Sequence, residues 1–293
     1  MDEVESMSRR GRRPARTPER LRADMVAVGM GLLAERGLNV GLDTVRFDEV
    51  IRAADAPRAS AYRAWSESDA EGVGPQERFH DALVAELLRE EPGFGDGAAG
   101  DGVGAADATF AAVSEVLERL PDLESLTPIE RGFWLQQIHR VGSNANVETM
   151  GAAGLWRCYV AVAAGLMSKP RVPGELREAW EVGEERMVAR YKDLYAAMAA
   201  MFGLQLRYCY TWEQFDTAAG ALGEGLAIRS SVNPHVRGIR RATGAGSAEQ
   251  EWTLFAVCFE GLLRQFFEPV PGAPAIDVAH EPAEGWGIRV RDA

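Results

Sequence analysis

The segment FDEVIRAADAPRASAYRAW, residues 47–65, decides the fold that we expect. It contains two short helical patterns joined by a turn of three or four residues. The first pattern has apolar residues at Val50, Ile51 and Ala54, which predict the side that packs against a core. The second has Arg, Ser, Tyr and Arg side chains and alanines where a structural hairpin usually has Leu or Ile. This layout predicts a helix-turn-helix whose alanines let the second helix lie close to a groove.

The flanking residues supply the other helices of a small N-terminal domain over 18–91. Thr17 precedes Pro18, a pair typical of a helix start, and Gly37 ends the apolar pattern that follows. Further helices are predicted over 45–54, 57–64 and 75–91. Residues 92–104 contain six glycines and therefore predict a flexible linker and a domain boundary.

The larger part of the chain, over 105–267, has apolar residues at three- and four-residue spacing and no alternating strand pattern. We therefore expect an all-α protein, with a larger helical bundle behind the N-terminal domain. Helices are predicted over 105–120, 128–142, 145–168, 173–202, 211–231 and 248–267. Residues 232–247 are predicted to form a basic surface loop, and the proline-containing end over 268–293 an irregular tail or strap.

The charge distribution is uneven along the chain. The formal net charge is −12, yet residues 1–65 contain 12 Arg and 10 acidic residues. A basic N-terminal end on an acidic body indicates that any polyanionic partner meets the N-terminus. Arginines are concentrated over residues 1–17, which we expect to be a disordered basic arm.

Residues 18–91 resemble the N-terminal domain of the TetR family of transcriptional regulators. LLAERGL, Leu32–Leu38, is similar to the end of that family's first helix and its glycine stop. VIRAADAPRASAYRAW, Val50–Trp65, is similar to its turn and recognition helix, with the tyrosine at Tyr62 and a tryptophan, Trp65, at the usual phenylalanine position. The resemblance covers about a quarter of the chain, and the remainder agrees as an all-helical bundle of suitable size.

The sequence departs from the family pattern at three places. Asp55 stands where the family usually has the turn glycine, and Asp tolerates a left-handed backbone better than most residues. Asp48 occupies a position that often faces DNA with a polar or basic side chain. The phosphate-binding lysine that normally follows the position of Trp65 is replaced by the acidic stretch SESDAEG.

The resemblance implies a DNA-binding role for residues of the helix-turn-helix and the arm. Arg58 and Ser60 would contact base edges, with Arg58 suited to a bidentate guanine contact, while Tyr62 and Arg63 would touch phosphates. Arg46, just before the first helix of the motif, is a further candidate for a DNA contact. The arm would reach into the minor groove or along the backbone through arginines that include Arg12 and Arg13.

The resemblance also implies a small-molecule pocket and a homodimer in the larger domain. We expect the dimer to form through the helices near 211–231 and 248–267, where small and apolar residues allow close helix approach. Aromatic and polar residues mixed on central helices are candidate ligand contacts. They are Trp134, Gln137, His139, Met150, Trp156 and Tyr159, for which plain core packing is the alternative interpretation.

The sequence gives little indication of catalysis, metal binding or a cofactor. The four histidines are scattered, and no HExxH, GxSxG or Walker pattern is present. The three cysteines, Cys158, Cys209 and Cys258, lie in apolar stretches and are expected to be small buried residues. No signal peptide or membrane span is predicted, so we expect a soluble cytoplasmic protein.

Two functions remain open from the sequence. The first is a homodimeric, ligand-responsive regulator, expected to be a repressor, that binds a palindromic double-stranded DNA operator and is released by a small molecule. The second is a helical ligand-binding or interaction protein of the same ancestry that has lost operator binding. Asp48, the missing lysine and the net charge of −12 favour the second.

Overall fold

The structure is a computed structural model that describes residues 16–38, 45–66, 73–90, 104–152, 154–168, 171–244 and 246–277. Most of the predicted basic arm, including Arg12 and Arg13, lies outside the described residues. The same holds for the predicted linker up to residue 103 and for the end of the chain after residue 277.

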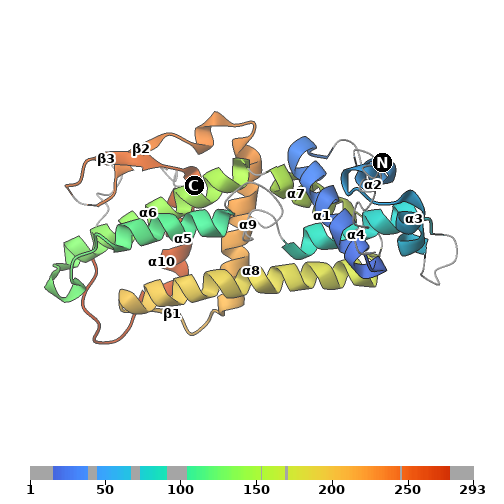
Figure 1. Cartoon of the computed structure of the whole chain (residues 1–293). Helices are drawn as coiled ribbons and strands as arrows, with labels where there is room; N and C mark the ends of the chain where they lie inside the picture. The colour runs from blue at the N-terminus through green and yellow to red at the C-terminus, as the bar shows by residue number, and fades with distance from the viewer. Residues whose placement is uncertain are drawn as a thin grey trace, which may run out of the picture.

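Helices dominate the described residues, as predicted, and they form two units (Figure 1). The N-terminal unit consists of α1 (Pro18–Arg36), α2 (Phe47–Ala53), α3 (Arg58–Ser66) and α4 (Pro75–Glu90). The C-terminal unit contains α5 (Ala105–Leu117), α6 (Pro128–Ala152), α7 (Gly154–Met167), α8 (Gly174–Met201), α9 (Trp212–Ser230) and α10 (Leu254–Phe266). Two short 3-10 helices lie in the C-terminal unit, η2 (Leu123–Ser125) between α5 and α6 and η3 (Pro234–Val236) after α9.

The ends of α1 form as the sequence predicts. The Thr17 side chain accepts a hydrogen bond from the Arg20 amide, with Pro18 as the first helical residue. Gly37 ends the helix with a φ of 72°, a backbone conformation that glycine adopts without strain.

The small residues of α3 face the protein core, which corrects one interpretation of the sequence. Ala61 and Ala64 are buried, and α3 packs against α1 and α4. Of the three alanines that we expected to approach a groove, only Ala59 is exposed. The missing bulk allows close helix packing inside the unit, where Trp65 and Phe79 contact each other edge to face with ring centroids 5.5 Å apart.

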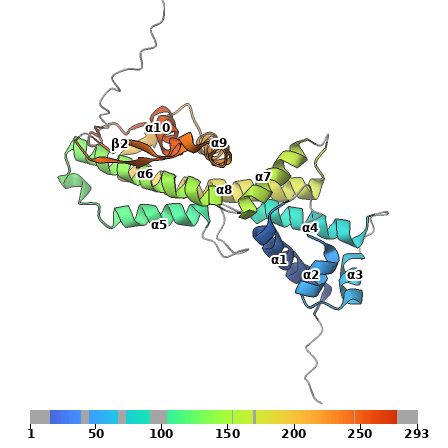
Figure 2. The same cartoon turned by 90° about the horizontal axis from the view of Figure 1, so that it is seen from above.

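Helix α8 connects the two units. It is 28 residues long, and its N-terminal part packs against α4 while its C-terminal part lies in the C-terminal bundle (Figure 2). Helix α7 packs against α1 and α4. Gly154 at the start of α7 is required by this contact, because an added Cβ would lie 2.8 Å from the Ala34 carbonyl oxygen.

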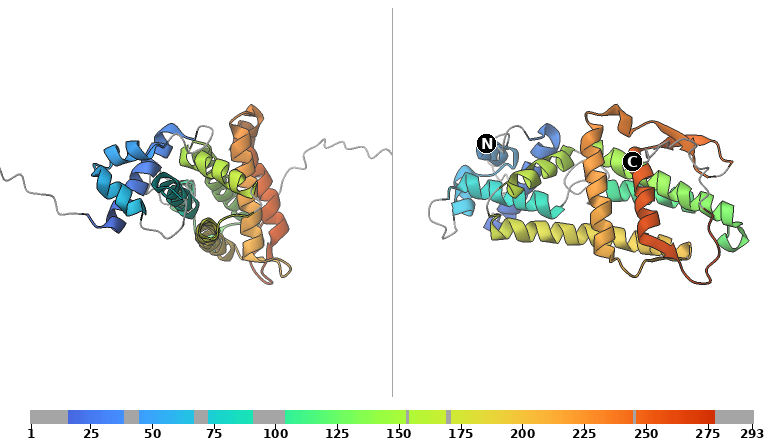
Figure 3. Two further views of the ribbon diagram at one scale, coloured as in Figure 1. Left: turned by 90° about the vertical axis from the view of Figure 1, so that its right-hand side faces the viewer. Right: turned by 180° about the vertical axis from the view of Figure 1, so that it is seen from behind.

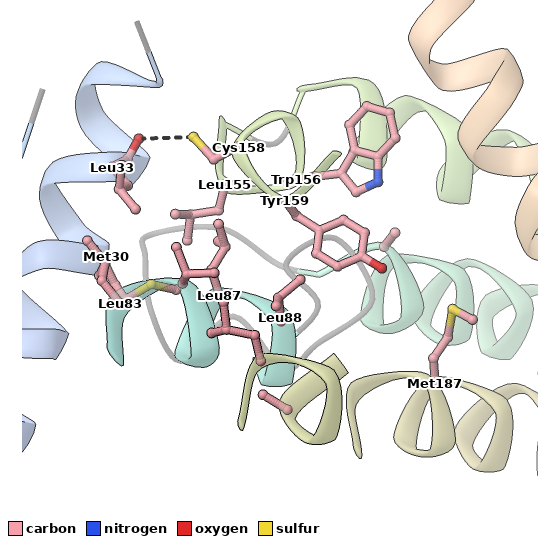
Figure 4. Packing of buried hydrophobic residues seen from close by; sticks show 14 of the residues in the cluster. Met30, Leu33, Leu83, Leu87, Leu88, Leu155, Trp156, Cys158, Tyr159 and Met187 are labelled. Carbon is pink, nitrogen blue, oxygen red and sulfur yellow. Dashed lines mark hydrogen bonds between the residues drawn. The ribbon is translucent and has the colours of Figure 1, made fainter. Parts of the chain in front are cut away.

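Figure 4 shows the hydrophobic packing where the two units meet. Leucines and Met30 of α1 and α4 lie against residues of α7, and the Cys158 thiol lies 3.8 Å from the Leu33 carbonyl oxygen. Cys158 is buried as predicted, but Cys209 and Cys258 are exposed, which contradicts the prediction for those two. Cys258 precedes the buried Phe259 but lies on another face of α10, and Tyr208 beside Cys209 is itself 98% exposed, so an apolar stretch alone does not bury a cysteine.

The break predicted near residues 143–144 is absent, because α6 continues to Ala152. Gly142, Ser143 and Asn146 disfavour a helix interior by local propensity, but all three are buried against neighbouring helices. A Cβ on Gly142 would lie 2.9 Å from Val113 of α5, so the glycine allows the two helices to pack closely.

Two small antiparallel sheets were missed by the sequence analysis. Strand β1 (Leu204–Leu206) pairs with β4 (Phe267–Pro269), at the start of the predicted irregular tail. Strand β2 (Ile239–Ala242) and β3 (Glu249–Trp252) form a hairpin within residues expected to be a loop and a helix. Strands of three or four residues are too short to show an alternating pattern, so their pairing is a tertiary effect.

Candidate functional site

The turn between α2 and α3 has the geometry that a helix-turn-helix requires. Asp55 has a φ of 49°, in the left-handed region that the sequence predicted for it. The Ala56 amide donates to the Ile51 carbonyl (3.0 Å), and the Ala54 amide donates to the Val50 carbonyl (2.8 Å). These bonds end α2 sharply and allow α3 to begin three residues after the turn.

The outer surface of α3 displays most of the predicted DNA contacts. Arg58, Ser60 and Arg63 are exposed, and Tyr62 is partly buried with its ring edge-on to Phe47 at 5.3 Å. Arg46, which precedes α2, is exposed and makes no capping hydrogen bond through its side chain. The fold therefore brings Arg58, Ser60, Tyr62 and Arg63 together on one helix.

Asp48 forms a polar network with two of these residues. Its carboxylate accepts from the Arg58 guanidinium at 3.2 Å and from the Tyr62 hydroxyl at 3.3 Å. The guanidinium also lies 5.4 Å from the centre of the Tyr62 ring. The Asp48 and Arg58 side chains are 54% and 69% exposed, so water competes with this pair. We call these three residues the surface network.

Two arginine side chains, one from α1 and one two residues before it, donate to backbone carbonyls of the α2–α3 segment. Arg16 donates to the Ala54 carbonyl (2.9 Å), and Arg22 donates to the Ala64 carbonyl near the end of α3 (3.0 Å). Because the last carbonyls of a helix have no partner within it, these bonds satisfy otherwise open acceptors. Arg16, which belongs to the predicted arm, is therefore engaged with the folded unit.

The C-terminal unit contains a cavity of about 300 Å³. Its walls come from α5, α6, α8, α10 and the β1–β4 sheet, and Ile276 of the chain end also lines it. Most of the lining is apolar, and the aromatic members are Tyr191, Tyr195, Phe255, Phe259 and Phe267. A mostly apolar enclosure of this size with a few polar groups is typical of a small-molecule site.

A stripe of polar residues on α6 faces this cavity. Gln136, His139, Ser143 and Asn146 follow one another at spacings of three and four residues, and each is less than 9% exposed. The Asn146 amide nitrogen donates to the Tyr191 hydroxyl (2.6 Å) and to Thr109 (3.2 Å). These side chains orient one another and leave polar atoms at the cavity wall.

His139 is the central member of the stripe. Its Nε2 lies 2.7 Å from the Ala256 carbonyl oxygen, and its Nδ1 lies 3.2 Å from the Ser143 hydroxyl. Nε2–H therefore donates to the carbonyl, and Nδ1 accepts from Ser143. Burial lowers the pKa of His139 to about 4, so the imidazole is neutral near pH 7.

Glu260 of α10 forms a buried ionic network at another part of the wall. It accepts from Arg241 of β2, from Arg264 (2.8 Å) and from the Gln136 amide (3.3 Å). The Arg241 guanidinium also stacks on Trp252, with its centre 3.9 Å from the ring centroid. We call Glu260, Arg241, Arg264 and Gln136 the buried network.

Only one of the six residues predicted to contact a ligand, His139, lines the cavity. Met150 borders a second, smaller cavity of about 20 Å³. Trp134 packs in a separate apolar cluster, and Gln137 accepts a long hydrogen bond (3.4 Å) from Arg140.

The other two, Trp156 and Tyr159, are core residues of α7. Both are less than 4% exposed, and the Tyr159 hydroxyl accepts a hydrogen bond from Trp180 at 3.2 Å. For these two the alternative interpretation, core packing, describes their positions.

The sequence contained a signal for the polar residues that line the cavity. Gln136, His139, Ser143 and Asn146 lie at helical spacing on one side of α6. Polar side chains in the positions where an amphipathic helix normally has apolar ones indicate a buried polar surface. Trp134 and Gln137 are close to these residues in sequence, but their side chains lie on other faces of α6 that do not line the cavity.

The described residues contain neither a cluster of metal-binding side chains nor a single helix suited to a membrane. None of their His, Cys, Asp and Glu side chains form a group of three or more that could hold a metal ion. No single described helix is long and apolar enough to span a membrane. Helices α6 and α7 reach that length and composition only when taken together, and the chain bends by 76° between them.

Comparison with known proteins gives little further information. No protein-family model matches the chain, and no curated protein is significantly similar to it. A solved structure of a protein with unknown function from Rhodococcus sp. RHA1 is similar at a TM-score of 0.41 and 13% sequence identity. The match covers 84% of this chain and 95% of that chain.

Proposed function

We propose that the protein is a TetR-type, ligand-responsive transcriptional regulator that binds a palindromic operator as a homodimer, most simply as a repressor. The observation that supports this most directly is the arrangement of α3. Ala61 and Ala64 pack inward, while Arg58, Ser60 and Arg63 are exposed after a turn with a left-handed residue at Asp55. Side chains of these types supply guanine and phosphate contacts when a helix enters the major groove.

The length of α8 supports a connection between ligand and DNA. Tyr191, Tyr195 and Met198 in its C-terminal half line the cavity, while its N-terminal half packs against α4, which in turn packs on α3. A ligand that prefers one position of α8 would change the populations of two orientations of the N-terminal units. The spacing of the two recognition helices in a dimer would change with it, and DNA would be released.

Helices α9 and α10 offer a surface for the dimer. They pack against each other and lie in front of the other described helices in the view from behind (Figure 3, right). The small or apolar residues that are exposed or partly exposed on this pair are Ala221, Gly225, Ile228, Leu254, Val257, Cys258, Gly261 and Leu262. The exposed polar residues lie toward the helix ends: Glu213, Gln214, Thr217, Arg229, Arg264 and Gln265. A small and apolar middle with polar ends suits a two-fold interface between copies of the same helix pair.

DNA binding is tested by fluorescence anisotropy with the DNA upstream of the protein's own gene and, if needed, with genomic fragments. We expect specific binding that weakens steeply with salt, because several phosphate contacts release counterions. The double variant Arg58→Ala, Tyr62→Ala should lose this binding. Ala59→Ser, an exposed change on the same helix, is the matched control. A folded dimer that binds none of these fragments would contradict operator binding.

The dimer is tested by light scattering after size-exclusion chromatography. An added Cβ at Gly225 or Gly261 meets no atom within 4 Å, so arginine at either position leaves the protomer intact. We expect Gly225→Arg and Gly261→Arg to produce monomers. Gly165→Arg, at an equally open exposed glycine of α7, should remain dimeric. A wild-type protein that elutes as a monomer would refute this interface.

The surface network favours the alternative function, a ligand-binding or interaction protein without an operator. Asp48 places a carboxylate beside Arg58 and Tyr62, where it would repel DNA phosphates unless it accepts from a cytosine amino group. Binding of a specific DNA fragment separates the two functions, and Asp48→Asn tests whether the carboxylate opposes DNA. A regulator should bind operator DNA before and after the change, whereas a protein of the second kind should bind no specific fragment in either form.

A further inference from the structure

A second buried carboxyl group lies outside the networks described above. Asp216 on α9 is only 4% exposed, and neither of its carboxylate oxygens accepts a hydrogen bond from any described residue. Burying a carboxyl group without a partner is costly, so such groups normally bind a proton, a water or a ligand. Lys192 of α8 is near enough to influence its charge, but the Lys192 ammonium pairs with Glu213 at 3.9 Å.

Asp216 borders the small cavity of about 20 Å³, which adjoins the larger one. Asn146, Tyr191, Tyr195 and Phe255 line both spaces. A space of about 10–15 Å³ or more, measured in this way, holds one water molecule, so the small cavity has room for one group of that size. A primary ammonium group has about this size and donates three hydrogen bonds.

The walls around this point suit a cation. Tyr191 and Tyr195 stack with ring centroids 5.9 Å apart, and Tyr195 lies 5.7 Å from Phe259. Aromatic rings attract cations through their electron-rich faces. The Asn146 amide nitrogen is already committed to Tyr191 and Thr109, which leaves its carbonyl oxygen as an acceptor beside Asp216.

The other charged groups of the cavity wall are already paired. Glu260 binds Arg241 and Arg264, and Glu268 binds Arg207 at 3.1 Å. No cationic group among the described lining residues is therefore left without an anionic partner to bind a carboxylate or phosphate ligand. The larger space is mostly apolar and suits an uncharged hydrocarbon or aromatic body.

We propose that the two adjoining cavities bind an apolar molecule with one primary amine, its ammonium at Asp216 and its body in the larger cavity. This inference rests on the proposed ligand-binding role of the C-terminal unit and names the class of its ligand. The amine fills the space of one water, and the carboxylate of Asp216 and the carbonyl of Asn146 accept its hydrogen bonds.

The test uses isothermal titration calorimetry of the full-length protein with four compounds that share one body. They are phenylbutylamine, phenylbutanol, phenylbutyrate and the trimethylammonium analogue of the amine. We expect the primary amine to bind about tenfold or more tightly than each of the others, because a buried charge-assisted hydrogen bond contributes more than a neutral one. The trimethylammonium group is too large for the small cavity.

Variants identify the carboxyl group responsible. Asp216→Asn removes an unpaired charge and keeps the shape, so the protein should fold, and its affinity for the amine should fall to that for the alcohol. Glu224→Gln is the matched control, because Glu224 is another partly buried acid of α9 that lines neither cavity. The affinity for phenylbutanol should be the same in all three proteins.

Four results would overturn the proposal. They are equal affinity for amine and alcohol, unchanged amine affinity in Asp216→Asn, absence of binding by all four compounds, and equal affinity for the amine and the trimethylammonium compound. The last would show that the small cavity does not hold the charge. This titration contains no DNA, so its outcome is independent of the anisotropy measurement. A regulator that does not bind amines fails only the titration, and an amine-binding protein that does not bind DNA fails only the anisotropy test.

Discussion

The surface network and the buried network are built from the same chemical groups in opposite surroundings. In the first, Asp48 meets Arg58 and Tyr62 with more than half of each charged side chain exposed. In the second, Glu260 is 9% exposed and accepts from two arginines and a glutamine. Water screens the first network, so breaking its ion pair costs little free energy. The second cannot lose Glu260 without leaving Arg241, whose side chain is only 26% exposed, without its carboxylate partner.

The largest effect that we expect comes from breaking the buried network. Glu260→Ala leaves Arg241 and Arg264 without their carboxylate. We expect a loss of about 3 kcal/mol, at the lower end of the range for buried pairs, because the two arginine side chains are 26% and 48% exposed and water solvates them in part. Urea denaturation followed by circular dichroism measures this change. The control is Glu249→Ala, which removes the carboxylate that pairs with Arg240 on the β2–β3 hairpin. Both side chains of this pair are more than 60% exposed. Similar losses for both variants would remove the contrast between the networks.

The second effect is a dependence of stability on pH through Asp216. Burial first, and then the charge of Glu213, raise the pKa of Asp216 from 3.8 to about 7. The folded protein therefore binds a proton that the unfolded chain releases, so this stabilisation is complete below about pH 4 and is lost as the pH rises through about 7. We expect wild type to lose roughly 2–4 kcal/mol between these limits through this group.

The contribution of Asp216 is isolated by comparing the wild-type protein with Asp216→Asn in denaturant titrations near pH 5 and about pH 8. Glu224, whose pKa is also raised to about 7, acts in the same direction. His139 acts in the opposite direction, since its lowered pKa costs stability as the pH falls below 6.5. Both groups remain in the variant and cancel in the difference. A difference that does not change with pH would show that Asp216 has an ordinary pKa in the folded protein.

The third effect concerns the alanines of α3. Ala61→Leu adds bulk to a site that is completely buried against neighbouring helices, and overpacking of this kind costs about 1–3 kcal/mol. Ala59→Leu adds the same atoms to the exposed side of the same helix and should change stability by less than about 0.5 kcal/mol. Thermal unfolding measures both. If Ala59→Leu were the more damaging change, the orientation of α3 would be wrong.

The smallest effect is expected for the surface network itself. Asp48→Asn keeps the shape and removes the charge that pairs with Arg58, and an exposed pair contributes less than about 1 kcal/mol. Chemical denaturation should detect almost no change. A loss comparable to that of Glu260→Ala would mean that the α2–α3 contact depends on this ion pair and is not a surface feature.

The two units also differed in how much of their structure was predictable. In the N-terminal unit, Thr17, Gly37 and Asp55 have the capping and turn conformations expected of them, because these depend on neighbouring residues in the chain. The side of α3 that faces outward followed from the positions of Arg58, Ser60 and Arg63. The burial of Ala61 and Ala64 could not be predicted in the same way, because a small residue is compatible both with a surface that enters a DNA groove and with a close contact between helices.

In the C-terminal unit, the existence of the helices was predictable but the cavity was not. Its lining comes from elements between Thr109 and Ile276, and no local pattern states which helix faces will meet. The helical spacing of Gln136, His139, Ser143 and Asn146 was the one signal in the sequence for its polar side. The short strands were not predictable either, because each is stabilised by a partner far along the chain or by a turn.

The sequence by itself determined the all-helical class, the ends of α1 and the left-handed turn at Asp55, since these follow from periodicity and local backbone preference. The tertiary structure alone decided three further features. They are the continuity of α6 through Asn146, the pairing of Asp48 with Arg58 and Tyr62, and the burial of Asp216 beside Tyr195. Each depends on which surfaces meet when helices pack, a choice made by the summed burial and hydrogen bonding of residues distant in the chain.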